Sequence, residues 1–263
     1  IKGVYKNLEL LAEPVLVHRA QALCYAWIYL DDHGLEEIDV QMTYVHLDTE
    51  MIKRFRETMT REELESWYQR LLDSYHKWLS YQMKWREERN RSMEKLEFPF
   101  IYRKGQKEMV AGIYHAISRK EQIFIQAPTG VGKTMSAVFP AVRSIGEGKA
   151  ETLFYLTART ITRTVAQDAF EILRKNGLLF KTVTITAKEK LCFCEKPECN
   201  PETCPYAKGH YDRINDAVYE LWTNEQSFDR ETILRQAEKW QVCPFEMSLD
   251  LSVWMDAVIC DYN

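Results

Sequence analysis

Residues Ala127-Pro128-Thr129-Gly130-Val131-Gly132-Lys133-Thr134 stand between an apolar run, Gln122–Gln126, and an apolar helical pattern that follows Thr134. A strand, a glycine-rich loop and a helix in this order form a binding site for the phosphates of ATP or GTP. The first N–H groups of the helix point at the anion, and the helix dipole adds to the attraction. We therefore predict that this 263-residue chain binds a nucleoside triphosphate.

Each position of the loop has its own part in this prediction. Gly130 and Gly132 place no side chain between the backbone amides and the phosphate oxygens. Lys133 is expected to reach the β- and γ-phosphates, and the Thr134 hydroxyl is expected to ligate Mg²⁺. Ala127 replaces the first glycine of the strict pattern. A glycine-rich hairpin with a chance Gly-Lys-Thr is the alternative. The predicted phosphate-binding residues are Thr129, Gly130, Val131, Gly132, Lys133 and Thr134.

Composition limits the class of protein. The length suggests two domains, and 46% hydrophobic residues suffice for ordinary cores. A formal net charge of −4 argues against nonspecific nucleic-acid binding by the whole surface, but it allows a local basic groove. The longest apolar stretch, Ala22–Leu30, is too short to span a bilayer, and no signal peptide is visible. We expect a cytoplasmic protein without a membrane partner.

The chain divides into zones. Residues 1–97 are rich in aromatic helical patterns, including one from about Arg61 to Lys95 with apolar side chains three and four apart. From residue 98 onward, strand and helix patterns alternate, which indicates a parallel sheet with crossover helices. Strands are expected at residues 122–126, 152–157, 182–186 and 256–261, and helices after Thr134 and after Thr160. A cysteine-containing insertion separates the segments 98–191 and 244–263 of this sheet domain.

The insertion, residues 192–243, contains Cys192, Cys194, Cys199, Cys204 and Cys243. None of them forms the Cys-x-x-Cys pairs typical of structural zinc sites, whereas thiolates from separate segments suit an iron–sulfur cluster. We expect Cys192, Cys199, Cys204 and Cys243 to be the ligands. Cys194 is left out because it and Cys192 lie too close in a strand-like run to point the same way. Zinc binding and ordinary buried cysteines remain open as alternatives.

These motifs together resemble the XPD/DinG family of iron–sulfur superfamily 2 DNA helicases, over about residues 98–263. The segment Tyr102-Arg103-Lys104-Gly105-Gln106 resembles the family's upstream motif, so that Arg103 and Gln106 are expected to sense the adenine. Leu191-Cys192 and Cys243-Pro244-Phe245 resemble the settings of the first and last cluster cysteines. The resemblance implies ATP, Mg²⁺ and a 4Fe–4S cluster as cofactors, and single-stranded or forked DNA as the partner.

The resemblance also implies contacts with DNA. Tyr155-Leu156-Thr157-Ala158-Arg159-Thr160 resembles the family motif that touches the phosphates of single-stranded DNA, with Thr157, Arg159 and Thr160 as the expected contacts. Near the cysteines, Arg213, Lys188 and Lys190 are further candidates, and a solvated surface role is the alternative for each. The acidic Asp-Glu-Ala-His motif and the second motor domain are expected after Asn263. The chain is therefore expected to be a fragment that neither hydrolyses ATP efficiently nor unwinds DNA by itself.

The first zone resembles the RecB-like branch of the PD-(D/E)XK nucleases. His18, Gln21 and Tyr25 lie on one face of a helix that begins near Pro14. The resemblance lies in the pattern Gln-x-x-x-Tyr, which follows a lysine-containing strand. It implies that Lys2 is a candidate catalytic residue that holds a phosphate or water. The acidic metal ligands are then expected before Ile1. Gln21 and Tyr25 as ordinary helix residues, hydrogen-bonded to neighbouring backbone, are the alternative.

The sequence thus predicts an α/β fold: a P-loop, RecA-like parallel sheet with an inserted cysteine-rich iron–sulfur domain, preceded by a partial α/β nuclease-like helical segment. The predicted function is that of a fragment of an ATP-dependent DNA helicase, with 5′ to 3′ movement implied by the resemblance and with a possible attached nuclease. The alternative is a nucleotide-gated, zinc-containing DNA-binding module without motor activity.

Overall fold

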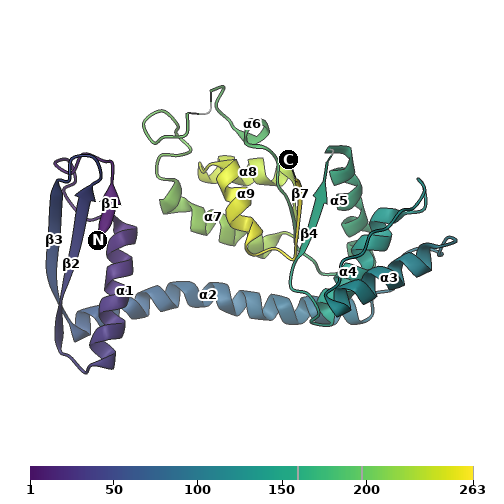
Figure 1. The fold of residues 1–263 in the computed structure, drawn as a ribbon, viewed down its shortest axis with the longest axis horizontal. Coiled ribbons are helices and arrows are strands. Elements are labelled where there is room, and N and C mark those ends of the chain that lie inside the picture. The colour runs from purple at the N-terminus through teal and green to yellow at the C-terminus, as the bar shows by residue number, and fades with distance from the viewer. Residues whose placement is uncertain (159, 197, 263) are drawn as a thin grey trace. The chain divides into compact units, whose positions relative to one another are not determined.

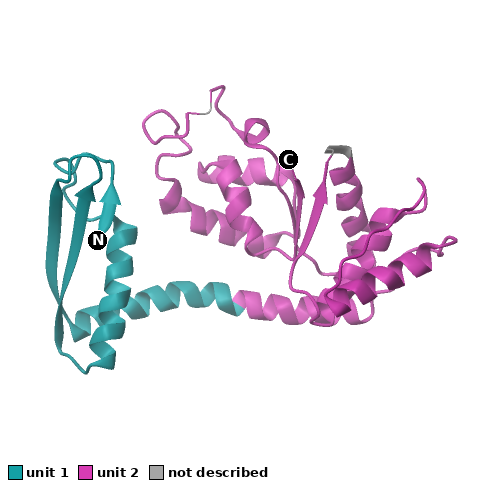
Figure 2. Ribbon diagram, in the orientation of Figure 1, with its two compact units in different colours: residues 1–80 teal, residues 81–263 magenta. Residues whose placement is uncertain are grey.

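The computed structural model describes residues 1–158, 160–196 and 198–262 (Figure 1). The chain divides into two compact units, Ile1–Ser80 and Tyr81–Asn263 (Figure 2). The division falls inside helix α2, Arg61–Glu94, whereas the sequence suggests a boundary after residue 97. Among the described helices, none combines the length and the apolar character that crossing a membrane requires.

The N-terminal unit is a small sheet packed against a helix. Its sheet has the order β1-β2-β3, with β1 (Lys2–Val4) parallel to β2 (Glu37–His46) and β2 antiparallel to β3 (Ile52–Thr60). Helix α1, Leu16–Asp32, covers this sheet. Leu23, Leu30, Val40 and Leu64 are among the buried side chains of their shared core. The helix that the sequence places near Pro14 is therefore α1.

The C-terminal unit contains a parallel four-stranded sheet in the order β4-β7-β5-β6. The strands are β4 (Leu153–Thr157), β5 (Thr182–Thr184), β6 (Ser227–Phe228) and β7 (Ala257–Asp261). The helices are α3 (Gln106–Arg119), α4 (Lys133–Gly146), α5 (Thr160–Lys175), α6 (Lys188–Leu191), α7 (His210–Asn224), α8 (Arg230–Trp240) and α9 (Pro244–Ser252). The parallel sheet predicted from the alternating pattern is confirmed.

Hydrophobic periodicity explains which helices cover the sheet. On α4, Val138, Val142 and Ile145 recur three and four residues apart, and all three are buried. The same spacing places Phe170 and Leu173 of α5 in one core with them. Helix α5 packs against β4 and β7, and α9 packs against β5. The helices expected after Thr134 and Thr160 are thus α4 and α5, and both pack into the core beside the parallel sheet.

One predicted strand is wrong. The apolar run Gln122–Gln126 lies outside the sheet and has no regular structure, although the structure describes all its residues. Phe124 is 93% exposed. A short apolar run becomes a strand only when a neighbouring strand pairs with it, and this requirement cannot be seen in local sequence. The other expected strands form, each within three residues of its predicted bounds.

The insertion contributes to the sheet as well as to the cysteine segment. It contains the helices α7 and α8, and between them the two-residue strand β6. Strand β6 pairs in parallel with β5 at Thr182 and Val183. The insertion is thereby joined to the edge of the sheet.

Candidate functional site

The glycine loop leads directly into α4, whose first residue is Lys133. Gly130 and Gly132 have φ angles of 82° and 78°, a left-handed region that glycine occupies without the usual steric cost. A Cβ atom on Gly132 would lie 2.7 Å from Nε2 of Gln106. The positive φ angles therefore favour glycine at both positions, and a side chain at position 132 would also displace the end of the Gln106 side chain.

Side chains at the start of α4 lie over the loop. The Lys133 ammonium donates hydrogen bonds to the carbonyl oxygens of Ala127 (3.0 Å) and Pro128 (2.8 Å). The Thr134 hydroxyl accepts a long hydrogen bond from Tyr155 at 3.5 Å. Loop carbonyls hold the lysine close to the first turn of α4, where phosphate oxygens are favoured by the free N–H groups and the helix dipole.

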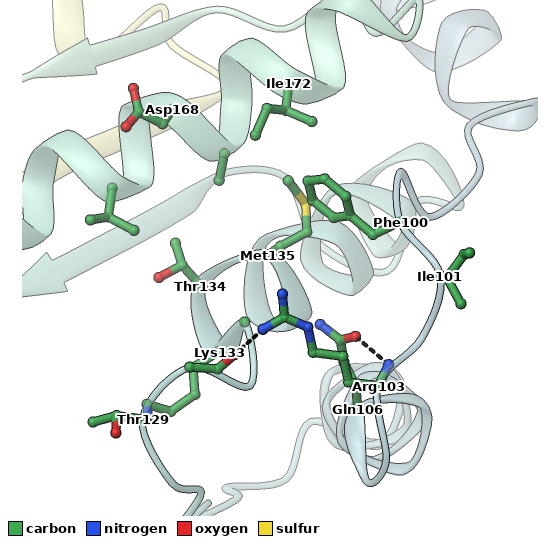
Figure 3. Close-up of a pocket in the computed structure, with 14 residues that line it drawn as sticks. Phe100, Ile101, Arg103, Gln106, Thr129, Lys133, Thr134, Met135, Asp168 and Ile172 are labelled. Carbon is green, nitrogen blue, oxygen red and sulfur yellow. Dashed lines mark hydrogen bonds between the residues drawn. The ribbon is translucent and has the colours of Figure 1, made fainter.

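Residues before α3 complete this site. The Oε1 atom of Gln106 accepts a hydrogen bond from the backbone N–H of Arg103 at 3.0 Å, and the Arg103 guanidinium donates to the carbonyl oxygen of Gly130 (Figure 3). Gln106 is buried at the first position of α3. The two residues that the sequence assigns to adenine recognition therefore contact the phosphate loop itself.

A cavity of about 730 Å³ opens between these elements. Figure 3 shows Arg103 and Gln106 on one side, Lys133 and Thr134 at the start of α4, and Asp168 and Ile172 of α5 opposite. Phe100, Ile101, Met135 and Ile172 give it apolar walls. A polar loop beside apolar walls suits a ligand with both a phosphate group and a flat base. Sequence reasoning missed the α5 residues, because only the crossover of α5 brings them opposite α4.

The predicted DNA-binding motif follows strand β4. Thr157, the last residue of β4, is buried, and its hydroxyl lies 2.6 Å from the Thr162 hydroxyl. This contact stabilises the junction between β4 and α5. Thr160 is the first residue of α5, and Arg159 lies outside the described residues. Nearby, the buried Arg163 donates to the Ile185 carbonyl oxygen at 3.1 Å.

A second cavity, of about 250 Å³, gathers the insertion cysteines. The Sγ atoms of Cys194 and Cys204 are 3.9 Å apart. Burial, followed by the hydrogen bond with Cys204, raises the pKa of the Cys194 thiol to about 11. Among the described residues, no three His, Cys, Asp or Glu side chains converge closely enough to hold one metal ion. The cysteines that line the cavity are Cys192, Cys194, Cys199, Cys204 and Cys243.

The argument that excluded Cys194 from the ligand set is wrong. Helix α6 ends at Leu191, and residues 192–194 form no strand, so the alternation of a strand does not separate their side chains. The Cys194 thiol interacts with both Cys192 and Cys204. Cys194 therefore shares the cavity with the four expected ligands.

Of the basic residues near these cysteines, Lys188 and Arg213 turn toward the protein, whereas Lys190 is exposed. The Lys188 ammonium makes a hydrogen bond with Cys199 and lies 5.6 Å from the centre of the Phe245 ring. The Arg213 guanidinium donates to three backbone carbonyl oxygens, those of Lys208 (2.8 Å), Trp240 (2.9 Å) and Gln241 (2.6 Å). These contacts occupy much of the donor capacity that a DNA phosphate would need.

A residue that sequence reasoning passed over also supports the cysteine cavity. His210 is 5% exposed, and its Nδ1 atom accepts a hydrogen bond from the backbone N–H of Cys243 at 3.2 Å. Burial lowers the pKa of this imidazole. His210 stands 33 residues before Cys243, so no local spacing could have indicated the contact.

The N-terminal unit has a site of its own, beside a cavity of about 580 Å³. The Lys2 ammonium donates to Gln21 Oε1 at 2.8 Å, and Gln21 Nε2 donates to the Tyr25 hydroxyl at 3.3 Å. His18 lines the same cavity, and its Nδ1 atom lies 3.2 Å from the Tyr44 hydroxyl. The structure thus brings together the lysine, glutamine and tyrosine that the sequence singles out.

Comparison with known proteins agrees with the nucleotide site. Residues 103–199 match the model of the DEAD/DEAH box helicase family. A segment of 49 residues is 43% identical to a probable ATP-dependent helicase of Methanocaldococcus jannaschii, and covers 19% of this chain and 7% of that protein. The chain therefore spans less than a tenth of the curated relative that it matches. Over residues 103–199, which include the glycine loop, the chain is thus similar to DEAD/DEAH box helicases, and the parallel sheet of the C-terminal unit is compatible with that similarity.

Proposed function

We propose that the chain is part of a DNA helicase that couples ATP hydrolysis to movement on single-stranded or forked DNA, in the 5′ to 3′ direction. The observation that carries this proposal is the cavity in which the glycine loop, Arg103 and Gln106 meet. The match to the helicase family model covers that loop and both of these residues.

In this proposal each site residue has a distinct task. Lys133 exchanges the carbonyl oxygens of Ala127 and Pro128 for the β- and γ-phosphate oxygens, while the amides after Gly130 hold the phosphates in place. Thr134 ligates Mg²⁺, and Arg103 with Gln106 recognises the base. Because Arg103 also binds the Gly130 carbonyl, base recognition and loop position are linked. Hydrolysis further requires groups that position water and neutralise developing charge.

The Lys133→Ala variant tests the nucleotide site. We expect ATP with Mg²⁺ to raise the melting temperature of the wild-type protein, because a ligand that binds only the folded state stabilises it. The variant should lose this increase, since it lacks the ammonium that binds the phosphates. Lys175→Ala, an exposed lysine outside the cavity, is the matched control. An unchanged increase in Lys133→Ala, measured by thermal shift, contradicts the proposed site.

We further propose that the cysteine cavity holds a 4Fe–4S cluster. Five thiols from three segments line one cavity, and this donor set suits iron–sulfur ligation. A cluster is larger than one ion, so its ligands stand further apart than those of a single metal. The cluster would be held by four of the five cysteines that line the cavity, Cys192, Cys194, Cys199, Cys204 and Cys243. Cys194 is included among the candidates because it lines the same cavity as the other four. The cluster would supply a rigid, redox-capable core for the insertion, which forms a wall of the DNA path.

A nuclease activity in the whole protein is a second candidate function. The chain of hydrogen bonds from Lys2 through Gln21 to Tyr25 favours it, because it holds an ammonium at the mouth of a cavity. There Lys2 would hold the scissile phosphate. Loss of metal-dependent DNA cleavage in a Lys2→Ala variant of the full-length protein, with ATPase activity retained, would support this role. A full-length protein that is colourless, contains zinc and binds DNA without ATPase activity would favour the nonmotor alternative.

A further inference from the structure

His18 is the third residue of helix α1, and it lines the cavity of the N-terminal unit. Its ring turns toward Tyr44 of β2, with 5.7 Å between the ring centres and 3.2 Å between His18 Nδ1 and the Tyr44 hydroxyl. The side chains of Lys2 and Gln21 line the same cavity. The phosphate contact proposed for Lys2 makes no use of His18, although the two residues share this cavity.

The Tyr44 hydroxyl determines which nitrogen of His18 carries the proton. It accepts a hydrogen bond from the backbone N–H of Val15 at 3.0 Å, and among the described residues its other partner is His18 Nδ1. Tyr44 is fully buried, so its O–H needs an acceptor inside the protein, and Nδ1 is that acceptor. A neutral imidazole that accepts at Nδ1 carries its proton at Nε2. His18 is therefore a hydrogen-bond donor at Nε2.

The charges around the cavity favour an anion. Burial, followed by the nearby Lys2 ammonium, lowers the pKa of His18, so the imidazole is neutral at pH 7. Among the described lining residues, Asp39 is the one carboxylate. It is engaged by the Arg56 guanidinium and by the Thr58 hydroxyl, the latter at 2.6 Å. The Lys2 ammonium and the His18 N–H are thus two donors at one cavity, an arrangement that suits the oxygens of a phosphate.

We propose that His18 is a second phosphate-binding residue of the N-terminal cavity, whose Nε2–H donates to a non-bridging oxygen of the DNA phosphodiester that Lys2 also holds. Tyr44 is then a positioning residue, because it fixes the tautomer and the orientation of the ring without touching the substrate. This inference rests on the nuclease proposed as the second candidate function. Two donors from different elements, β1 and α1, hold a phosphate in one orientation, whereas a single ammonium does not.

The experiment follows the cavity by NMR in the 263-residue chain, with tetrathymidylate as the probe and without divalent metal ions. The ring nitrogens of His18 report its tautomer, and the side-chain amide of Gln21 reports the affinity in every variant. We expect the Nε2–H tautomer in the wild-type protein, and a shift of both groups when the probe is added. The affinity at Gln21 should fall about fivefold to tenfold in His18→Leu, which lacks the donor. His18→Gln should restore most of it, because its amide retains an N–H.

Two further variants separate the donor from its support. Tyr44→Phe keeps the buried ring but removes the hydroxyl, so His18 should populate both tautomers and the affinity at Gln21 should fall several-fold. His76→Gln is the matched control, because His76 is an exposed histidine of α2 that does not line the cavity. This control should equal the wild-type protein in both measurements.

The possible results separate this inference from the nuclease on which it rests. If the full-length protein cleaves no DNA with Mg²⁺ or Mn²⁺, the nuclease is overturned, and the shifts at His18 and Gln21 alone decide whether the cavity binds phosphate. If cleavage occurs and requires Lys2, but His18→Leu keeps the wild-type affinity at Gln21, the inference alone is overturned. A wild-type His18 with its proton at Nδ1 overturns the inference as well.

Discussion

Among the described residues of the C-terminal unit, Lys181 is the most completely buried charged side chain, with an exposure of 1%. Its ammonium donates to the carbonyl oxygens of Trp222 and Glu225, and it lies 4.2 Å from the centre of the Trp85 ring. Burial lowers the pKa of Lys181 from 10.5 to about 8, although Asp256 and Glu225 oppose the change. One lysine therefore makes the stability of this unit depend on pH.

The sign of this dependence follows from proton binding. Between pH 8 and 10.5 the unfolded chain keeps the lysine proton and the folded chain releases it, so the free energy of unfolding should rise with pH. The pKa difference corresponds to roughly 3 kcal/mol across that range. We expect Lys181→Met to remove this rise, as measured by urea denaturation of both proteins at successive pH values. A wild-type protein that loses stability relative to the variant as pH rises would contradict the prediction.

At the scale of elements, the C-terminal end of α2 is an integral part of the C-terminal unit. Trp85 and Arg89 lie one turn apart on this helix, and both bind the buried carboxylate of Asp256. The Trp85 indole N–H donates at 3.0 Å, the Arg89 guanidinium at 2.5 Å and the backbone N–H of Lys181 at 2.8 Å. Asp256 directly precedes β7, so α2 fixes the start of a central strand of the sheet.

Removal of one partner of the buried ion pair between Arg89 and Asp256 should lower the free energy of unfolding substantially. Arg89→Ala leaves the Asp256 carboxylate buried without its cation, since both side chains are less than 10% exposed. We expect a loss of about 3–5 kcal/mol in the free energy of unfolding. Arg91→Ala, two residues away, breaks an exposed pair with Glu87 and should cost less than about 1 kcal/mol. Urea denaturation of the two variants measures this difference. Equal losses of unfolding free energy would show that the buried pair stabilises the protein no more than the exposed pair does.

Elements with a local signal could be predicted from the sequence. The long helix from Arg61 is visible in its apolar spacing, and it ends at Glu94, one residue before the expected end. The strand at residues 122–126 could not be judged, because pairing with another strand is not a local property. The prediction that the Cys194 side chain points away from the Cys192 side chain was wrong for the same reason. Residues 192–194 look like a strand in sequence, but they form a loop because no neighbouring strand pairs with them.

At the scale of the whole molecule, the order of motifs predicts the parallel sheet, because alternating strands and helices have few ways to pack. Contacts between distant segments were beyond prediction. β6 joins the sheet from within the insertion, and His210 supports Cys243. Lys188 turns inward to the cysteines. In each case the decisive partner is separated in sequence, and only the folded chain brings the two together.

Helix α2, which belongs to both units, has a practical consequence for the choice of a shorter fragment that contains the C-terminal unit. A fragment that starts at Phe98 would discard the indole and guanidinium partners of Asp256, together with Met93, whose Cβ would lie 2.7 Å from a Cβ placed on Gly146. We expect that fragment to be poorly soluble and to melt without cooperativity in calorimetry. A fragment that starts at Tyr81 should give a sharp transition. A truncation site should therefore be chosen so that the fragment keeps the residues that bind the buried Asp256 carboxylate, even where they lie outside the sequence motifs.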